Sequence, residues 1–270
     1  MLHLQAIQFA AHDARQGAAF PFSIPSIAAL ADTRLAFSTE VTFLIGENGS
    51  GKSTFLEGLA CAIGSITVGS EQVETDPSLQ HARLLAKSMK LSWTRKTRRG
   101  FFLRSEDFFG YAKHMKQVRE ELEQDLRAVQ EDTTLSPEAR AYGSLPYARE
   151  IADMQRRYGE SLDAYSHGES FITLFQSRFV PDGLYLLDEP EVPLSPMRQL
   201  AFLAMLKQMV TERNAQFIIA THSPILMAFP QASIYTFDEG KVRQIAYEEI
   251  EHVRLTRDFL NNPALFLRHL

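Results

Sequence analysis

The sequence predicts an α/β fold in which a mainly parallel core sheet carries an antiparallel β part and an inserted helical subdomain. Three observations support this prediction. An apolar run at 41–45 leads through a glycine-rich turn into a helix-like pattern at 55–60. Strand-like and helix-like patterns alternate from 183 to 237, which is typical of a parallel sheet covered on both faces. Between these parts, apolar residues at helical spacing predict helices from about 105 to 160.

Composition bounds the class of protein. The 270 residues are 45% hydrophobic and 23% charged, which suits one large domain or a domain with an inserted subdomain. A net charge of −5 argues against a surface coated for nucleic acid, although local patches remain possible. Cys61 is the single cysteine, so no intrachain disulfide can form and a reducing cytosol fits best. With no signal-like start and no long apolar span, we expect a cytoplasmic protein without membrane insertion.

The N-terminal part is rich in strand patterns. Residues 2–9 alternate between apolar and polar side chains, and 35–37 supply further strand material. The prolines of Phe20-Pro21-Phe22-Ser23-Ile24-Pro25 predict a loop or a sheet edge there. An aromatic ring in this loop could stack on an adenine base, but anchoring the loop in the core is its more ordinary use.

The glycine-rich turn is a phosphate-binding motif. It fits the pattern G-x-x-x-x-G-K-[ST], whose glycines let backbone N–H groups surround a phosphate chain at the positive end of a helix. Lys52 then reaches the β- and γ-phosphates, and Ser53 holds Mg²⁺. In a glycine-rich turn without a nucleotide, the buried charge of Lys52 would lack a partner, which is costly. We therefore expect a nucleotide site formed by Gly46, Glu47, Asn48, Gly49, Ser50, Gly51, Lys52, Ser53 and Thr54.

A basic segment lies between 83 and 104, where eight Lys or Arg residues occur without an acid. The flanking apolar residues predict a β-hairpin whose tip carries Arg95, Lys96 and Arg98. Such a tip can bind nucleic-acid phosphates or an acidic partner. A solvated turn is the more ordinary use of a charged tip on an acidic chain, so both alternatives stay open.

The middle of the chain is helical. Apolar residues from Phe108 to Val129 step by three or four, which predicts an amphipathic helix that packs on its neighbours. Ser136-Pro137-Glu138 has the residues of a helix start, and Pro146 is expected to open another helix.

Polar residues end two buried strands of the second half. Asp188 follows four apolar strand residues and is the expected acid of the Mg²⁺ shell, and Glu189 beside it can orient or deprotonate the attacking water. His222 ends the next strand, where it can contact a γ-phosphate and position the water. Because the carboxyl ends of parallel strands face one crevice, we expect these groups to meet.

One more motif precedes a helical run at 171–175. In Ser166-His167-Gly168-Glu169-Ser170, a hydroxyl, backbone N–H groups and the helix dipole can face an anion, although this pattern alone could be a plain N-cap. Together with Lys52, Asp188 and His222 in this order, it resembles the ABC-type ATPase superfamily. That resemblance implies that Ser166, Gly168 and Glu169 form the signature loop, which binds the γ-phosphate held by the other protomer.

The resemblance covers nearly the whole chain. Two motifs look less like those of a transporter subunit: Leu-Leu-Asp-Glu-Pro-Glu at 186–191 and Thr-His-Ser-Pro at 221–224. They look more like those of stand-alone AAA/ABC ATPases and of the ATPase heads of SMC, RecF and OLD proteins. It implies a P-loop NTPase fold of ABC-ATPase type in a single domain, 1–270.

Within that domain, the resemblance implies a division of the chain. The nucleotide-binding core with its β part is expected in 1–104 and 166–270, and the helical subdomain in about 105–165, leading to the signature loop.

Three positions depart from the family pattern. The signature has His167 and Glu169 where transporters carry Gly and Gln. No lid Gln is evident, so Arg104 or Glu106 is the expected substitute. The Asp that couples the two sites is missing, and Ser195 is the nearest candidate.

The expected function is Mg²⁺-dependent ATP binding and hydrolysis by an ATP-dependent homodimer. The resemblance favours a role in DNA maintenance or in defence against foreign DNA, with DNA or an effector protein as partner. Two alternatives remain: an ATP-binding subunit of a membrane transporter, and a slow nucleotide-gated switch that controls an effector protein.

Overall fold

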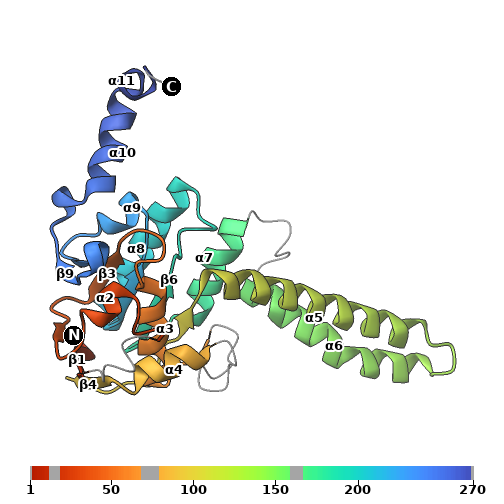
Figure 1. The fold of residues 1–270 in the computed structure, drawn as a ribbon. Helices are drawn as coiled ribbons and strands as arrows, with labels where there is room; N and C mark the ends of the chain where they lie inside the picture. Colours follow the sequence, from red (N-terminus) through yellow and green to blue (C-terminus); the bar gives the residue numbers. More distant parts are fainter. Residues whose placement is uncertain (1, 12–18, 68–78, 159–166, 269–270) are drawn as a thin grey trace.

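The structure is a computed structural model, which describes residues 2–11, 19–67, 79–158 and 167–268 (Figure 1). Over these residues the larger sheet has the strand order β5-β6-β7-β3-β8-β9, and every neighbouring pair is parallel except β8 and β9. The predicted α/β fold with a mainly parallel sheet is therefore confirmed. The strands are β3 (Val41–Ile45), β5 (Phe102–Leu103), β6 (Leu184–Asp188), β7 (Gln216–Ala220), β8 (Ser233–Thr236) and β9 (Arg243–Gln244).

The central strands are buried on both faces. In β3, Leu44 faces one hydrophobic cluster while Phe43 and Ile45 face another, and in β6 Leu186 and Leu187 divide in the same way. Successive side chains of a strand point to opposite faces, so a strand covered on both sides is apolar at most positions. This explains the mainly apolar runs before the site residues.

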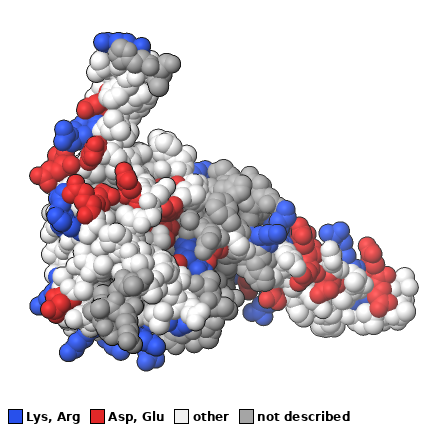
Figure 2. Space-filling view, viewed as in Figure 1, with Lys and Arg blue, Asp and Glu red and all other residues white. Residues whose placement is uncertain are grey.

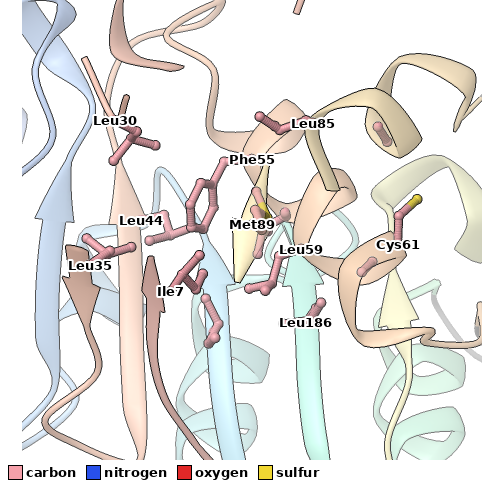
Figure 3. Packing of buried hydrophobic residues seen from close by; sticks show 14 of the residues in the cluster. Ile7, Leu30, Leu35, Leu44, Phe55, Leu59, Cys61, Leu85, Met89 and Leu186 are labelled. Atoms are coloured by element: carbon pink, nitrogen blue, oxygen red, sulfur yellow. The ribbon is translucent and has the colours of Figure 1, made fainter. Parts of the chain in front are cut away.

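One face of the sheet is covered by α3 (Lys52–Ile63) and α4 (Gln80–Ala86). Figure 3 shows Phe55 of α3 packed close to Leu44 of the sheet, and Leu59 of α3 belongs to the same cluster. A second, antiparallel sheet of order β2-β1-β4 closes this cluster, which confirms the predicted antiparallel β part. Its strands are β1 (Leu4–Phe9), β2 (Arg34–Ala36) and β4 (Met89–Trp93).

The opposite face is covered by α7 (His167–Arg178) and α8 (Pro196–Arg213) over a cluster of aromatic rings. The rings of Tyr185 and Phe217, on neighbouring strands, stack with centroids 5.0 Å apart. The Tyr185 hydroxyl donates to the Val180 carbonyl at 2.8 Å and accepts from the Val180 N–H at 2.7 Å. Burial raises the pKa of Tyr185 to about 12, so this anchor stays neutral.

Two long helices, α5 (Ser105–Glu131) and α6 (Pro137–Tyr158), pack together as a hairpin that projects from the body (Figure 1). The predicted helix start is confirmed, since the Ser136 hydroxyl accepts from the Ala139 N–H at 3.2 Å. The prediction that Pro146 opens a separate helix is wrong, because this proline lies inside α6. A proline removes one backbone hydrogen bond from a helix, and α6 packs along α5.

The prediction of a basic β-hairpin is also wrong. β4 belongs to the antiparallel sheet and β5 to the parallel one, so residues 94–101 connect the two sheets. Arg95 and Arg99 lie 3.2 Å and 3.7 Å from carboxylate oxygens of Asp182. At Gly100, with φ +113°, an added Cβ would lie 1.9 Å from the Leu184 carbonyl oxygen, so glycine is required where the connector meets β6.

Short elements complete the chain, and the last two helices extend away from the body (Figure 1). They are α2 (Pro25–Ala28), α9 (Pro224–Met227), η2 (Asp238–Gly240), η3 (Tyr247–Glu249), α10 (Glu251–Asn261) and α11 (Pro263–Leu267).

Candidate functional site

The phosphate loop turns between β3 and α3 through glycines in left-handed or related conformations. Gly51 precedes α3 with φ +101°, and an added Cβ there would lie 2.7 Å from the Ser26 hydroxyl oxygen. At Gly46, with φ +145°, an added Cβ would lie 2.9 Å from a carboxylate oxygen of Asp238. Any side chain at either position would displace the loop, so both glycines are needed for this geometry.

Lys52 lies at the centre of the loop. Its Nζ donates to the carbonyl oxygens of Gly46 at 2.7 Å and Glu47 at 2.9 Å, and the residue is only 4% exposed. Burial lowers the pKa of Lys52, and the charges of Glu189 and Asp188 oppose that shift. The loop therefore encloses a cation that faces acidic groups at the end of β6.

Two residues that sequence reasoning missed support the loop. The Ser26 hydroxyl donates to the Ser50 carbonyl oxygen, which ties α2 to the loop. Asp238 accepts from the Glu47 N–H at 2.8 Å, and its other carboxylate oxygen accepts from the Thr236 hydroxyl at 2.8 Å.

A sequence signal for Asp238 existed. This acid lies two residues after the end of β8, which pairs in parallel with β3. Functional side chains of parallel sheets gather at the carboxyl ends of the strands, and Asp238 has such a position. Ser26 lies in a short proline-led helix and had no comparable signal.

Asp188 ends β6 beside the start of α3. It is 8% exposed and accepts a hydrogen bond from the Ser53 side chain. Burial, aided by the nearby Glu189 charge, raises the pKa of Asp188 to about 7. One of its carboxylate oxygens, Oδ1, is buried without a hydrogen-bond partner in the described part of the chain.

These two residues fit a Mg²⁺ ion. Mg²⁺ prefers hard oxygen ligands, and it is commonly held by one or two protein groups together with substrate phosphates and water. A hydroxyl and a buried carboxylate with an unpartnered oxygen supply such a partial set. Over the described residues no group of three or more His, Cys, Asp or Glu side chains forms a metal cluster.

Glu189 and His222 face each other at the ends of neighbouring strands. The His222 Nε2 lies 3.8 Å from the Glu189 Oε1, just beyond hydrogen-bond distance. Glu189 has φ +49°, and its N–H donates to the Ala220 carbonyl at 2.9 Å, so the chain bends sharply there. Burial and the charge of Lys52 lower the pKa of His222, so its ring is neutral near pH 7.

Glu191 holds the loop that carries His222. Its carboxylate accepts from the His222 N–H at 2.6 Å and from the Thr221 side chain. Burial raises the pKa of Glu191, and these hydrogen bonds oppose the shift. The sequence contained this acid two residues after Glu189, but nothing local indicated which loop it would reach.

His252 is another group that sequence reasoning missed. It lies in the first turn of α10 and makes a hydrogen bond to the backbone of His222. Its Nε2 is buried without a hydrogen-bond partner among the residues that the structure describes, and burial lowers the pKa of its ring. The C-terminal helix is thus bonded directly to the loop of the site.

The remaining predicted residues are placed only in part. Ser166 lies outside the described residues, and Gly168 and Glu169 lie in the first turn of α7. Glu106 lies in the first turn of α5, where Arg104 pairs with Asp107 at 2.8 Å. Their roles in a signature loop or a lid remain predictions.

Ser195 is the remaining candidate for the missing coupling acid. It is the exposed N-cap of α8, so its hydroxyl is accessible at the surface. Its coupling role likewise remains a prediction.

Two family models match the chain. One, described as "AAA domain", matches residues 23–156, and the other, described as "AAA domain, putative AbiEii toxin, Type IV TA system", matches residues 170–228. Both models describe AAA domains, and together with the phosphate loop they support the predicted ATP-binding P-loop ATPase domain. No curated protein matches the chain.

Solved structures with a similar fold include ABC cassettes and an SMC head. The cbiO1 protein from Clostridium perfringens, described as part of the ABC transporter complex cbiONQ, is 16% identical, with 98% of each chain covered and a TM-score of 0.47. The dimeric structure of MJ0796, a bacterial ABC transporter cassette, is 16% identical over 93% of this chain and 100% of its own, with a TM-score of 0.46. The Smc head domain from Pyrococcus furiosus is 11% identical over 96% of this chain and 100% of its own, with a TM-score of 0.43.

In the described part of the chain, no helix has the length and apolar character needed to cross a membrane.

Proposed function

We propose that the chain is a Mg²⁺-dependent ATPase whose catalytic unit is a head-to-tail dimer in the cytoplasm. One observation carries the proposal: the ends of β3, β6 and β7 bring Lys52, Asp188, Glu189 and His222 together around the start of α3. A phosphate loop, a metal-binding acid, a base and a neutral histidine are the parts that phosphoryl transfer to water needs.

Binding rests on the loop and on Lys52. The Nζ of Lys52 now bonds to loop carbonyl oxygens and would instead meet the β- and γ-phosphate oxygens of ATP. Ser53 and Asp188 would hold Mg²⁺, which neutralises charge on the same phosphates when bound. The raised pKa of Asp188 reflects a buried carboxylate that gains stability once a cation lies beside it.

Hydrolysis rests on Glu189 and His222. The Glu189 carboxylate accepts a proton from water, and the water oxygen forms a bond to the γ-phosphorus as the bond from that atom to the bridging oxygen breaks. The products are ADP and inorganic phosphate. His222, neutral and 3.8 Å from Glu189, can donate a hydrogen bond to the γ-phosphate and keep the water in line.

The openness of the site supports a second chain in the catalytic unit. The side chains of Glu189 and His222 are 33% and 36% exposed, whereas efficient transfer requires fixed donors and excluded water. Exposed apolar residues follow the site in sequence, with Val192 at 53% and Met197 at 75%. We propose that the partner covers this face.

The partner would present its own signature loop. The Ser166 hydroxyl and the backbone N–H groups of Gly168 and Glu169 of that chain would donate hydrogen bonds to the γ-phosphate, with the dipole of α7 adding positive potential.

Mixing two inactive variants tests the composite site. Lys52→Ala should destroy ATP binding, and Gly168→Asp should place bulk and negative charge against the γ-phosphate of the neighbouring chain. In a mixed dimer one site combines both defects and the other has neither. Random co-assembly therefore should restore about a quarter of the wild-type turnover, measured as phosphate release.

Two results would contradict this mechanism in different ways. Absence of any turnover in the wild type refutes the ATPase itself. Turnover by a strictly monomeric wild type, with no recovery in the mixture, refutes only the shared site.

The cellular role proposed from the family resemblance is DNA maintenance or defence against foreign DNA. Lys96 and Arg98 are exposed on the connector between the sheets, where phosphates could reach them. Turnover measured at low salt with and without DNA distinguishes this role from a switch acting on an effector protein, and cofractionation with membranes would favour a transporter subunit instead.

A further inference from the structure

The C-terminal arm, defined as α10 and α11, is strongly amphipathic and projects from the body (Figure 1). On α10, helical spacing places Val253, Leu255, Phe259 and Leu260 on one half of the surface. The charged residues Glu251, Arg254, Arg257 and Asp258 occupy the other half.

Only the base of this apolar face is covered. Val253 is 4% exposed, whereas Leu255 is 55% and Leu260 69% exposed. On α11, Leu265 and Leu267 are each 51% exposed. A helix of this length is marginal in water without packing, and a contiguous exposed apolar face marks a protein contact.

The two helices of the arm hold one shape. The rings of Phe259 on α10 and Phe266 on α11 meet edge to face, with centroids 5.7 Å apart. The apolar residues of both helices therefore belong to one surface.

Charge is separated along the arm. Glu248, Glu249 and Glu251 are exposed at its base, Arg254 and Arg257 follow on α10, and Arg268 lies at the outer end; from 254 to 268 Asp258 is the only acid among the described residues. Figure 2 shows acidic side chains gathered where the arm leaves the body and basic ones at its outer end. Such a surface is complementary to itself when two copies run in opposite directions.

We propose that the arm is a docking surface for the arm of a second copy, paired antiparallel about a two-fold axis. In an isologous contact of this kind the same surface serves both chains, so the basic outer part of each arm lies beside the acidic base of the other. The leucines of the exposed face are then buried between the arms, and the charge pattern selects the antiparallel direction.

This contact differs from the proposed ATP-dependent one. It uses neither the phosphate loop nor the signature loop, so it forms without nucleotide and survives Lys52→Ala. A result that refutes the ATPase mechanism therefore does not refute the arm contact, and a result that refutes the arm contact does not refute the ATPase mechanism.

Mass measurement in solution tests the contact. By light scattering without nucleotide at about 50 µM, a range in which specific homodimers are populated, the wild type is expected at twice the 30.5 kDa of one chain. Leu255→Glu with Leu260→Glu should give a monomer. Both sites are exposed, so the fold is kept, which circular dichroism and thermal unfolding check. Tyr142→Glu, at 75% exposed on α6, is the matched control and should remain dimeric.

A charge exchange tests the direction of pairing. Arg254→Glu with Arg257→Glu should weaken the dimer about tenfold or more, and so should Glu248→Lys with Glu249→Lys. Combining all four substitutions should restore it. A monomeric wild type, or a dimer unaffected by the leucine substitutions, overturns the proposal, and failure of the four-fold variant to recover overturns the antiparallel pairing.

Discussion

Asp188 gives a prediction whose magnitude follows from its burial. Its pKa is raised from 3.8 to about 7, and one pKa unit is about 1.4 kcal/mol, so the ionised carboxylate costs the folded, Mg²⁺-free chain about 4 kcal/mol. That is a large part of the stability of a typical domain. Replacing Asp188 with Asn keeps the shape of the side chain and removes this cost.

The sign of the pH dependence follows from the raised pKa. Below the unfolded value near 4 the carboxyl is protonated in both states, and its contribution to folding is fully present. As the pH rises toward the folded value of about 7, the unfolded chain releases its proton first, and that contribution is lost. The wild type should therefore lose stability relative to Asp188→Asn between about pH 4 and 7, and the difference should stay constant above that range.

Urea unfolding of both proteins in EDTA, from pH 4 to 8.5, measures the effect. The raised pKa of Glu191 is present in both proteins, so the difference between them isolates Asp188. At pH 8 the variant should be more stable by up to about 4 kcal/mol, while near pH 4 the two should agree. Mg²⁺ with ADP should stabilise the wild type more than the variant. Parallel pH profiles for the two proteins would refute the assignment of Asp188 as a buried, proton-linked metal ligand.

Two further predictions concern binding and turnover. Lys52→Ala should weaken ATP binding about 100-fold or more, because at least two charge-assisted contacts to phosphate are lost. Titration with a fluorescent nucleotide measures this affinity. An unchanged affinity would count against this placement of the loop. His252→Ala should lower kcat several-fold with little change in KM, because the backbone of His222 loses its hydrogen bond. His252→Asn should recover much of the rate, since its amide can donate to the same group. Equal kcat values in all three proteins would show that His252 does not position His222.

The local pattern of residues was sufficient for the elements that surround the site. Strands buried on both faces are apolar at most positions, so the runs ending at Ile45, Asp188 and Ala220 could be recognised without knowing their neighbours. The glycines and the lysine of the phosphate loop occur at fixed spacing because that spacing alone makes the loop. The sequence by itself therefore determined the fold class, the loop and the acids and histidine at the strand ends.

Only the tertiary structure decided how distant segments meet. Asp238 supports the loop because β8 lies beside β3, and His252 reaches His222 because α10 begins next to the loop after β7. No local period or spacing specifies such contacts, since they depend on strand order and helix placement. The basic connector was wrongly predicted to be a β-hairpin for the same reason. β4 and β5 are close in sequence, but each forms its hydrogen bonds within a different sheet. Backbone pairing across a sheet is a long-range property of the fold.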